Sequence, residues 1–477
     1  VHRDVNPHNI LLSYKGGVVL ADFGVARLQG LEGGRAEEAA FGKLGYLSPE
    51  QLQGKPIDLL ICNAGVYLDK GQPLDDALGQ HRGFAALDPR DRAFVRLLLA
   101  TTLRHLGEIE GVLSGLITKP LEGANAVGRQ VLRLGAAQLM FLGTPPHAAV
   151  DTSVRLVEDA GLHHLKGLVN AVLRRISRDG DALLVDRDPA RLNTPRWLWE
   201  SWIHAYGEDA TRAIASAHLH EAPLDITVRR DADHWAAQLD AEKLPTGTLR
   251  RKGGGHIAEL PGFAEGIWWV QDAAAALPAR LLGDVTDKRV ADLCAAPGGK
   301  TMQLCAAGAK VTAVDISPRR MTRLGENLAR AGLEAELVTA DASKWTPAEK
   351  FDAILLDAPC SGTGTLRRHP DIAWLKDDED VARLNVTQDR LLVHALGLLK
   401  PGGTLVYAVC SLQEDEGPER INALLARNPQ VKRMRVTPAE LPGLEDAITP
   451  RGDVRTLPFM WSERGGLDGF YIARLTA

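Results

Sequence analysis

Two cysteines in this 477-residue sequence stand where a chain could carry out covalent chemistry. Cys360 lies in the run Asp357-Ala-Pro-Cys-Ser-Gly-Thr-Gly, and Cys410 lies in Leu405-Val-Tyr-Ala-Val-Cys-Ser, each at the end of an apolar, strand-like stretch. An open α/β sheet places its reactive groups at such strand ends. A thiolate can add to an electron-poor carbon, and a second thiol beside it could help to reverse the addition. The pair therefore indicates covalent catalysis on a pyrimidine ring.

Short apolar runs alternate with helical patterns from Arg289 onward. This alternation predicts an α/β doubly wound, Rossmann-like domain with a parallel sheet over residues 286–477. The expected strands cover residues 290–294, 311–316, 336–341, 351–357 and 404–410. Ligands of such sheets bind at the carboxyl ends of the strands, so the loops that follow them should form the site.

The first strand leads into a turn of small residues, Asp292-Leu-Cys-Ala-Ala-Pro-Gly-Gly-Lys-Thr. Small residues let backbone amides approach a ligand at the N-terminus of the next helix. The turn lacks the Gly-x-Gly-x-x-Gly spacing of dinucleotide folds, and hydride transfer does not need the Asp-Ala-Pro-Cys run. S-adenosyl-L-methionine fits better, with its methionine end against the turn. The residues expected to contact it are Cys294, Ala295, Ala296, Pro297, Gly298, Gly299 and Lys300.

Three aspartates end neighbouring strands. Asp315 follows the second strand, where it could accept hydrogen bonds from ribose hydroxyls. Asp341 follows the third strand and suits an adenine or ribose contact, and Asp357 could bind the ammonium group of the cofactor or a polar edge of the target base. The structural alternative for Asp315 and Asp341 is that their carboxylates only cap helices.

Residues 66–185 have a helical pattern, with apolar positions that recur on one face, such as Leu168, Val169, Val172 and Leu173. The pattern predicts an all-α bundle. Its segments 88–94, 132–139 and 166–175 resemble the NusB-type RNA-binding helical domain, although a scaffold without a ligand remains an alternative. Residues 186–285 mix helical signals with strand-like alternation and predict a small α+β subdomain.

Basic side chains form two groups. The first, in the helical region, consists of Lys166, Arg174 and Arg175. The second, just after the Cys360 loop, consists of Arg367, Arg368 and His369. Both groups are expected to contact RNA phosphates, and the position of the second beside a catalytic loop favours that role. A solvated helix face is the alternative for the first group.

Composition narrows the class of protein. A hydrophobic content of 45%, with 25% charged residues, is typical of a soluble, globular, multidomain protein. The net charge of -5 argues against non-specific coating of nucleic acid but allows a local basic groove. The five cysteines form no Cys-x-x-Cys pair with companion histidines, so neither disulfides nor a metal site is expected. No apolar run is long enough to cross a membrane and no export signal is evident, which predicts a cytoplasmic location.

The first residues resemble part of a protein kinase. His2-Arg-Asp-Val-Asn-Pro-His-Asn, Asp22-Phe-Gly and the run at 45–50 match a kinase catalytic loop, magnesium loop and activation-segment end. By this resemblance Asp4 would orient the attacking hydroxyl, while Asn9 and Asp22 would hold magnesium. The rest of a kinase lobe is missing, so we expect residues 1–56 to be an incomplete fragment without kinase activity, joined by a junction at 57–65.

The motifs of the last domain together resemble the Sun/Fmu (RsmB-type) cytosine-C5 RNA methyltransferases. The resemblance rests on the 292–301 turn, the Cys360 and Cys410 strand ends, Arg367-Arg-His-Pro-Asp-Ile and Gly465-Gly-Leu-Asp-Gly-Phe-Tyr. With the NusB-like region it covers about residues 66–477 and implies a bacterial enzyme of small-subunit ribosomal RNA. It also implies that Cys410 is the nucleophile, that Cys360 assists product release, and that the turn and the three aspartates bind S-adenosylmethionine. Val409 departs from the threonine usual in the family and removes a hydroxyl beside Cys410.

The implied mechanism follows from cytosine, whose C5 is a poor nucleophile until a group adds at C6. Cys410 would add there, and a protonated group, with Asp357 as the candidate, would stabilise the charge that moves toward N3. The base must leave its stack, so single-stranded or locally melted RNA is the expected partner.

Two alternatives stay open from the sequence. DNA cytosine methyltransferases use a cysteine in a Pro-Cys loop, which would make Cys360 the nucleophile. A non-catalytic NusB-like RNA-binding factor would bind RNA without any affinity for S-adenosylmethionine.

Overall fold

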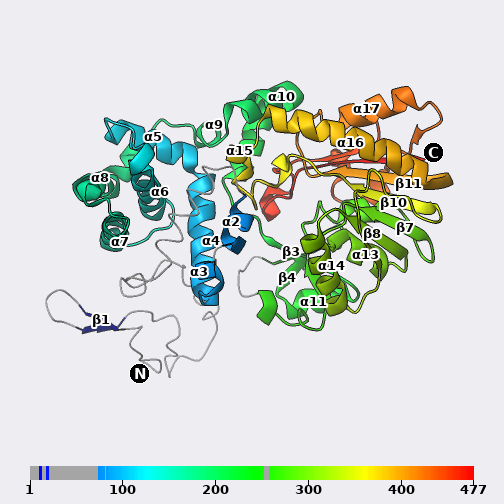
Figure 1. The fold of residues 1–477 in the computed structure, drawn as a ribbon, viewed down its shortest axis with the longest axis horizontal. Coiled ribbons are helices and arrows are strands. Elements are labelled where there is room, and N and C mark those ends of the chain that lie inside the picture. The colour runs from blue at the N-terminus through cyan, green and yellow to red at the C-terminus, as the bar shows by residue number, and fades with distance from the viewer. Residues whose placement is uncertain (1–9, 13–17, 21–72, 81, 252–256, 477) are drawn as a thin grey trace. The chain divides into compact units, whose positions relative to one another are not determined.

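The computed structural model describes residues 10–12, 18–20, 73–80, 82–251 and 257–476 (Figure 1). The chain divides into two compact units, residues 1–193 and residues 194–477. Within the predicted kinase-like fragment, only β1 (Ile10–Leu12) and β2 (Val18–Leu20) are described, and they pair antiparallel. Asp4, Asn9 and Asp22, and the junction at 57–65, lie outside the described residues.

The described part of the first unit is otherwise helical, as predicted. Its helices are α2 (Leu74–Gln80), α3 (Arg82–Ala85), α4 (Pro89–Arg104), α5 (Leu106–Leu116), α6 (Ala126–Met140), α7 (Pro146–Asp159), α8 (Lys166–Leu184) and α9 (Pro189–Leu192). The carboxylate of Asp88 begins α4 by accepting a hydrogen bond from the Asp91 backbone N–H at 2.9 Å.

Close contact between α6 and α8 builds the centre of this bundle. Val169, Val172 and Leu173 of α8 are buried, so the apolar face predicted there is confirmed. Gly135 of α6 lets the two helices approach, because a Cβ at this position would lie 2.6 Å from a Leu173 methyl group. No helix in the described ranges is both long and apolar enough to cross a bilayer.

The second unit opens with the long helix α10 (Arg196–His218) and a small α+β region. Its four-stranded sheet has the order β4-β5-β3-β6 and is antiparallel throughout. The elements are β3 (Leu224–Val228), α11 (Ala232–Gln238), β4 (Ala241–Lys243), β5 (Leu249–Arg251) and β6 (Trp268–Val270). This helix and these strands confirm the α+β character predicted for the region.

The large sheet has the order β12-β14-β11-β10-β7-β8-β9, with β13 paired to β14. Its parallel strands are β7 (Arg289–Leu293), β8 (Lys310–Asp315), β9 (Glu336–Thr339), β10 (Phe351–Asp357) and β11 (Leu399–Val409). The sheet is mixed, not purely parallel as expected, because β14 (Phe470–Thr476) pairs antiparallel with β11. Two short strands, β12 (Lys432–Arg433) and β13 (Val454–Thr456), pair antiparallel with the other side of β14.

Helices cover both faces of this sheet (Figure 1). Alternate residues of β10 enter opposite cores: Ile354 and Leu356 pack with α16 and α17, while Ala353 and Leu355 pack with α12 and α13. The helices are α12 (Leu277–Arg280), α13 (Gly299–Ala306), α14 (Pro318–Ala331), α15 (Ile372–Leu375), α16 (Asp378–Leu398) and α17 (Pro418–Arg427). Burial on both faces explains why the strands read as nearly continuous apolar runs.

The order of the strands decides where a ligand can bind. β7 lies between β8 and β10, so the chain leaves β7 toward one side and later returns to the other side. Ligands bind at such a switch point, beyond the carboxyl ends of the strands. The turn after β7 and the loops after β10 and β11 therefore meet at one edge.

Candidate active site

Cys360 and Cys410 meet at the carboxyl edge of the sheet. β10 and β11 are neighbouring parallel strands in which Asp357 pairs with Ala408, so the residues that follow these strands are brought side by side. The two Sγ atoms lie 3.4 Å apart, within hydrogen-bond distance for sulfur. The structure thus brings together two thiols that are 50 residues apart in sequence.

The surroundings of Cys360 favour its protonated form. Its hydrogen bond with Cys410 raises the pKa of Cys360 well above its usual range, and burial and the negative charge of Glu416 act in the same direction. Because the pKa of Cys360 is raised, its sulfur keeps a proton that it can donate to the neighbouring Cys410 sulfur.

Lys300 and Asp357 form an ion pair beside the thiols. Lys300 Nζ lies 2.7 Å from Asp357 Oδ2 and 5.4 Å from the centre of the Phe470 ring. Burial lowers the pKa of Lys300, but the negative charges of Asp357, Cys410 and Asp292 outweigh burial and raise it overall. Lys300 carries the proton in this ion pair, so Lys300 is a second candidate for the protonated group, and the role expected of Asp357 stays a prediction.

The small-residue turn after β7 contains two residues with a left-handed backbone conformation. Cys294 and Gly298 have positive φ angles of 63° and 104°, and Gly298 begins α13. A Cβ on Gly298 would lie 2.8 Å from Leu324 Cγ, so only glycine fits without displacing α14. The turn therefore presents the backbone of residues 294–299, with Lys300 reaching back to Asp357.

Asp292, just before this turn, is a residue that the sequence analysis missed. It is fully buried; Thr301 donates a hydrogen bond to its Oδ2 at 2.6 Å, and its Oδ1 has no hydrogen-bond partner among the described residues. Burial raises the pKa of Asp292 to about 7. One feature of the sequence could have revealed it: a charged residue inside an otherwise apolar strand, close to the strand end where ligands bind.

Asp315 lies at the end of β8, 2% exposed, against the turn. Its Oδ2 accepts a hydrogen bond from the Ala296 N–H at 3.2 Å, and its Oδ1 accepts one from the Ser317 N–H at 3.0 Å. Arg320 also pairs with Asp315 at 3.3 Å. The sequence analysis missed Arg320. A basic residue in the first turn of a helix is unfavourable with respect to the helix dipole, so its presence there indicates a specific partner.

Asp341 follows β9 and is more exposed than Asp315. Its Oδ1 accepts hydrogen bonds from the Ser343 N–H at 2.9 Å and the Ser343 hydroxyl at 2.7 Å, which hold its pKa below the usual range. This carboxylate stabilises a turn and does not cap a helix, while its Oδ2 lies 3.7 Å from Lys344 Nζ. Asp341 therefore keeps an oxygen available at the sheet edge.

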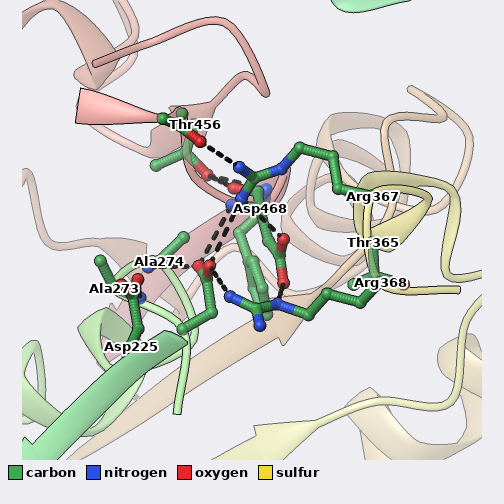
Figure 2. A network of polar contacts seen from close by, with 12 residues as sticks. Asp225, Ala273, Ala274, Thr365, Arg367, Arg368, Thr456 and Asp468 are labelled. Atoms are coloured by element: carbon green, nitrogen blue, oxygen red, sulfur yellow. Dashed lines mark hydrogen bonds and ion pairs between the residues drawn. The ribbon is translucent and has the colours of Figure 1, made fainter. Parts of the chain in front are cut away.

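Of the two arginines Arg367 and Arg368, the first is placed differently from the prediction, and its expected phosphate contact is corrected here. Arg367 is 1% exposed, and both guanidinium groups are paired with Asp272 and Asp468 (Figure 2). The shortest contacts are 2.8 Å from Arg368 to Asp272 and 3.1 Å from Arg367 to Asp468. Because Arg367 is buried and needs such partners, it holds loops together and is not available to RNA. Arg368 makes the same ion pairs but is 23% exposed, so its RNA contact stays a prediction. His369 is half-buried beside them.

The basic group of α8 lies on the outer face of the first unit. Lys166 pairs with Glu158, Arg174 donates to Asn170 at 2.8 Å, and Arg175 lies 3.7 Å from Asp179. Arg174 and Arg175 are exposed. These contacts are compatible with a solvated face and with a phosphate-binding face, so the RNA contact of this group stays a prediction.

Comparison with known proteins places this site in a family. The family described as "16S rRNA methyltransferase RsmB/F" matches residues 279–476, and the NusB family matches residues 60–178. Ribosomal RNA small subunit methyltransferase B of Klebsiella pneumoniae subsp. pneumoniae is 38% identical over 402 residues, which are 80% of this chain and 93% of the relative. This chain belongs to the RsmB/F family of 16S rRNA methyltransferases. The resemblance drawn from the motifs is confirmed.

Further relatives agree. The enzyme of the same name from Vibrio cholerae serotype O1 is 35% identical over 428 residues, 86% of this chain and 94% of that protein. The crystal structure of PH0851 has a TM-score of 0.71 at 22% identity and covers 91% of this chain and 99% of that one. NSun6 from Pyrococcus horikoshii with SFG has a TM-score of 0.50 at 20% identity, covering 59% and 98%. At these identities the two likenesses show that this chain shares their fold. The methyl donor of the RsmB/F family is S-adenosylmethionine.

Proposed function

We propose that this chain transfers a methyl group from S-adenosylmethionine to C5 of a cytosine in small-subunit ribosomal RNA. The observation that carries the proposal is the pair of thiols 3.4 Å apart beside the Lys300–Asp357 ion pair. Cytosine C5 needs a nucleophile at C6 before it can react, and a thiolate with a nearby proton donor supplies that need. The names of the curated relatives support ribosomal RNA as the substrate.

The residues at the carboxyl edge suit S-adenosylmethionine. The turn at 294–300 offers backbone groups and a glycine cradle, the buried Asp292 has an oxygen without a partner among the described residues, and Asp315 and Asp341 end adjacent strands. Carboxylates at these positions match ribose hydroxyls and an ammonium group. When bound, the cofactor supplies an electrophilic methyl group. Cys294, Ala295, Ala296, Pro297, Gly298, Gly299 and Lys300 would line its methionine end.

In the proposed reaction, Cys410 is the nucleophile. Its thiolate forms a bond from Sγ to C6, and electron density moves toward N3 of the base. The Lys300 ammonium, held by Asp357, stabilises this density, and C5 becomes nucleophilic. C5 would then take the methyl group that the bound cofactor supplies, as the sulfur–methyl bond of the cofactor breaks. The C5 proton passes to water, and cleavage of the Sγ–C6 bond, with its electron pair returning to Sγ, restores the aromatic ring.

Cys360 is proposed to assist the last step. It keeps its proton in the pair, as the raised pKa of Cys360 indicates, and can donate it to Cys410 when that sulfur leaves C6. The reverse assignment, in which Cys360 attacks as in DNA cytosine methyltransferases, would require a thiol whose pKa is raised well above its usual range to be the thiolate nucleophile.

We also propose how the chain divides its work. The NusB-like region, residues 66–185, would bind RNA through Lys166, Arg174 and Arg175. The α+β region, residues 186–285, would link it to the catalytic domain, residues 286–477. A base in single-stranded or locally melted RNA is the proposed target, because a stacked base cannot reach the thiols. Since ribosomal RNA is the proposed substrate, the proposed place of action is the cytoplasm.

The deciding experiment incubates the full chain with labelled S-adenosylmethionine and unmodified small-subunit ribosomal RNA, then maps 5-methylcytosine. One modified cytosine that depends on Cys410 is expected. Absence of label from the RNA, with retained cofactor binding by calorimetry, would contradict the proposal. Absence of both would favour a non-catalytic RNA-binding factor.

A further inference from the structure

Glu416 is a fully buried carboxylate behind the two cysteines. It lies in the segment between β11 and α17, six residues after Cys410. Its Oε1 accepts hydrogen bonds from the Ser361 N–H at 2.8 Å and from Gln388 Nε2 at 3.1 Å. Its Oε2 accepts hydrogen bonds from the hydroxyls of Ser361 and Ser411, both at 2.5 Å. One carboxylate thus binds four donors.

Two of the residues bound to Glu416 directly follow the cysteines. Ser361 follows Cys360 and Ser411 follows Cys410, and their hydroxyl oxygens are also 3.1 Å apart. Gln388 of α16 extends the contact, because its Nε2 also donates to the Pro359 carbonyl at 2.9 Å. The carboxylate therefore joins the loop after β10, the loop after β11 and α16 at a single point.

The chemistry of these donors requires an acceptor-only group. An ionised carboxylate offers about four lone-pair positions, which match the four donors of this site. All four donors are neutral, and a buried charge is tolerated only when it is hydrogen-bonded in this way. A glutamine of the same shape would turn an N–H group toward at least one existing donor. The four bonds therefore distinguish glutamate from its isosteric amide.

We propose that Glu416 is a positioning residue that sets the distance and direction between the Cys360 and Cys410 thiols. The expected effect on catalysis rests on the proposed function, whereas the effect on the placement of the two thiols does not. Glu416 touches neither substrate nor reacting atoms in this role; it acts through Ser361 and Ser411. Its negative charge also contributes to the raised pKa of Cys360, which keeps the proton on the thiol that donates.

The test uses Glu416→Gln in the full chain. We expect kcat for methyl transfer to fall about 10- to 100-fold, while KM for S-adenosylmethionine stays within about twofold, because thiol placement changes and the cofactor site does not. In the absence of RNA, the pH profile of Cys360 alkylation by iodoacetamide, read by peptide mass, should move to lower pH. Glu416→Asp keeps the charge and should restore that profile in part.

Matched variants separate this role from a general effect on folding. Asp415→Asn changes the exposed neighbouring residue and should leave both readouts unchanged. Ser411→Ala removes one donor and should give a smaller loss of kcat in the same direction, which keeps the inference testable if Glu416→Gln does not fold. An unchanged kcat and an unchanged Cys360 alkylation profile in Glu416→Gln would overturn the inference. A rise in alkylation at Cys305 as large as the rise at Cys360 would also overturn it, because it would indicate general loosening of the fold. If the unmodified chain lacks methyl transfer, the proposed function fails, and the alkylation profiles still decide the role of Glu416.

Discussion

Cys360 and Cys410 share one contact but differ in what surrounds them. The negative charge of Glu416 disfavours a thiolate at Cys360 and so raises the pKa of Cys360. Cys410, in contrast, interacts with Lys300 and contributes to the raised pKa of Lys300. A thiolate formed at Cys410 would interact with the Lys300 ammonium, whereas the Cys360 thiol interacts with the Glu416 carboxylate. Opposite surroundings for two identical side chains are what separate roles require.

Substitution of each cysteine should give a different product. Cys410→Ala should abolish methyl transfer, because it removes the proposed nucleophile. Cys360→Ala should still form the adduct but release it slowly, so a protein–RNA band should persist on a denaturing gel. The opposite pattern, with trapping in Cys410→Ala, would assign the attack to Cys360.

Lys300 provides a second test at a single side chain. Lys300→Gln removes the ammonium beside Asp357 and should lower the single-turnover rate of methyl transfer by about 10²- to 10⁴-fold, the range of a lost proton carrier. Lys310→Gln, at the exposed start of β8, is the matched control and should behave like the unmodified chain. A rate within about threefold of normal in Lys300→Gln would remove Lys300 from the mechanism.

Several elements of the second unit are joined by buried ion pairs. Arg250 on β5 pairs with Asp225 on β3, both fully buried, and donates to the Gly466 carbonyl at 2.6 Å. Arg367 and Arg368 meet Asp468 from the loop before β14 (Figure 2). The small antiparallel sheet, the loop after Cys360 and the last strand are thereby held to one another around the catalytic edge.

Loss of one acid from this group should be costly. Asp468→Asn leaves buried guanidinium charge without one of its partners, so we expect the free energy of unfolding to fall by about 3–5 kcal/mol. Urea unfolding followed by fluorescence measures the change, with the exposed Asp415→Asn as control. A loss under about 1 kcal/mol would mean that Asp272 alone compensates both arginines.

For the chain as a whole, Asp292 links stability to pH. An unfolded aspartate has a pKa of about 3.9, whereas burial raises the pKa of Asp292 to about 7 in the folded chain. Between these values the folded chain binds more protons than the unfolded chain, so the Asp292 contribution lowers stability as pH rises and becomes constant above pH 7.

Asp292→Asn should remove this dependence. Above pH 7 the variant should be more stable than the unmodified chain by up to roughly 4 kcal/mol, and the two should converge near pH 4. Urea unfolding across this pH range measures the difference. Asp284→Asn, at a fully exposed aspartate, should show no comparable gain, and an equal gain there would rule out burial as the cause.

RNA recognition is the second property of the whole chain. Reversal of charge at Lys166, Arg174 and Arg175 should raise KM for RNA and reduce its salt dependence, because phosphate contacts release counterions. KM for S-adenosylmethionine should not change. Arg155→Glu on α7 is the control, since Arg155 is exposed but lies outside the group. Unchanged RNA kinetics in the triple variant would leave this group as a solvated helix face.

The sequence by itself determined the large sheet and the position of its chemistry. Apolar runs alternating with helices predict parallel strands, and the carboxyl ends of such strands meet at one edge wherever the loops lead. Cys360, Cys410 and the 294–300 turn therefore had to converge, and the structure brings them together. The antiparallel edge was not predicted, because β14 is an ordinary apolar run whose direction depends on where the chain returns.

Only the tertiary structure decided which charges are paired. Arg368 and its partner Asp272 are 96 residues apart, and Lys300 and Asp357 are 57 residues apart, so no local spacing links them. A motif shows that an arginine or a carboxylate is present, but its role depends on which opposite charge shares its burial. For this reason Arg367 changed from an expected RNA contact to a buried anchor, and Glu416 gained a role that its own segment does not signal.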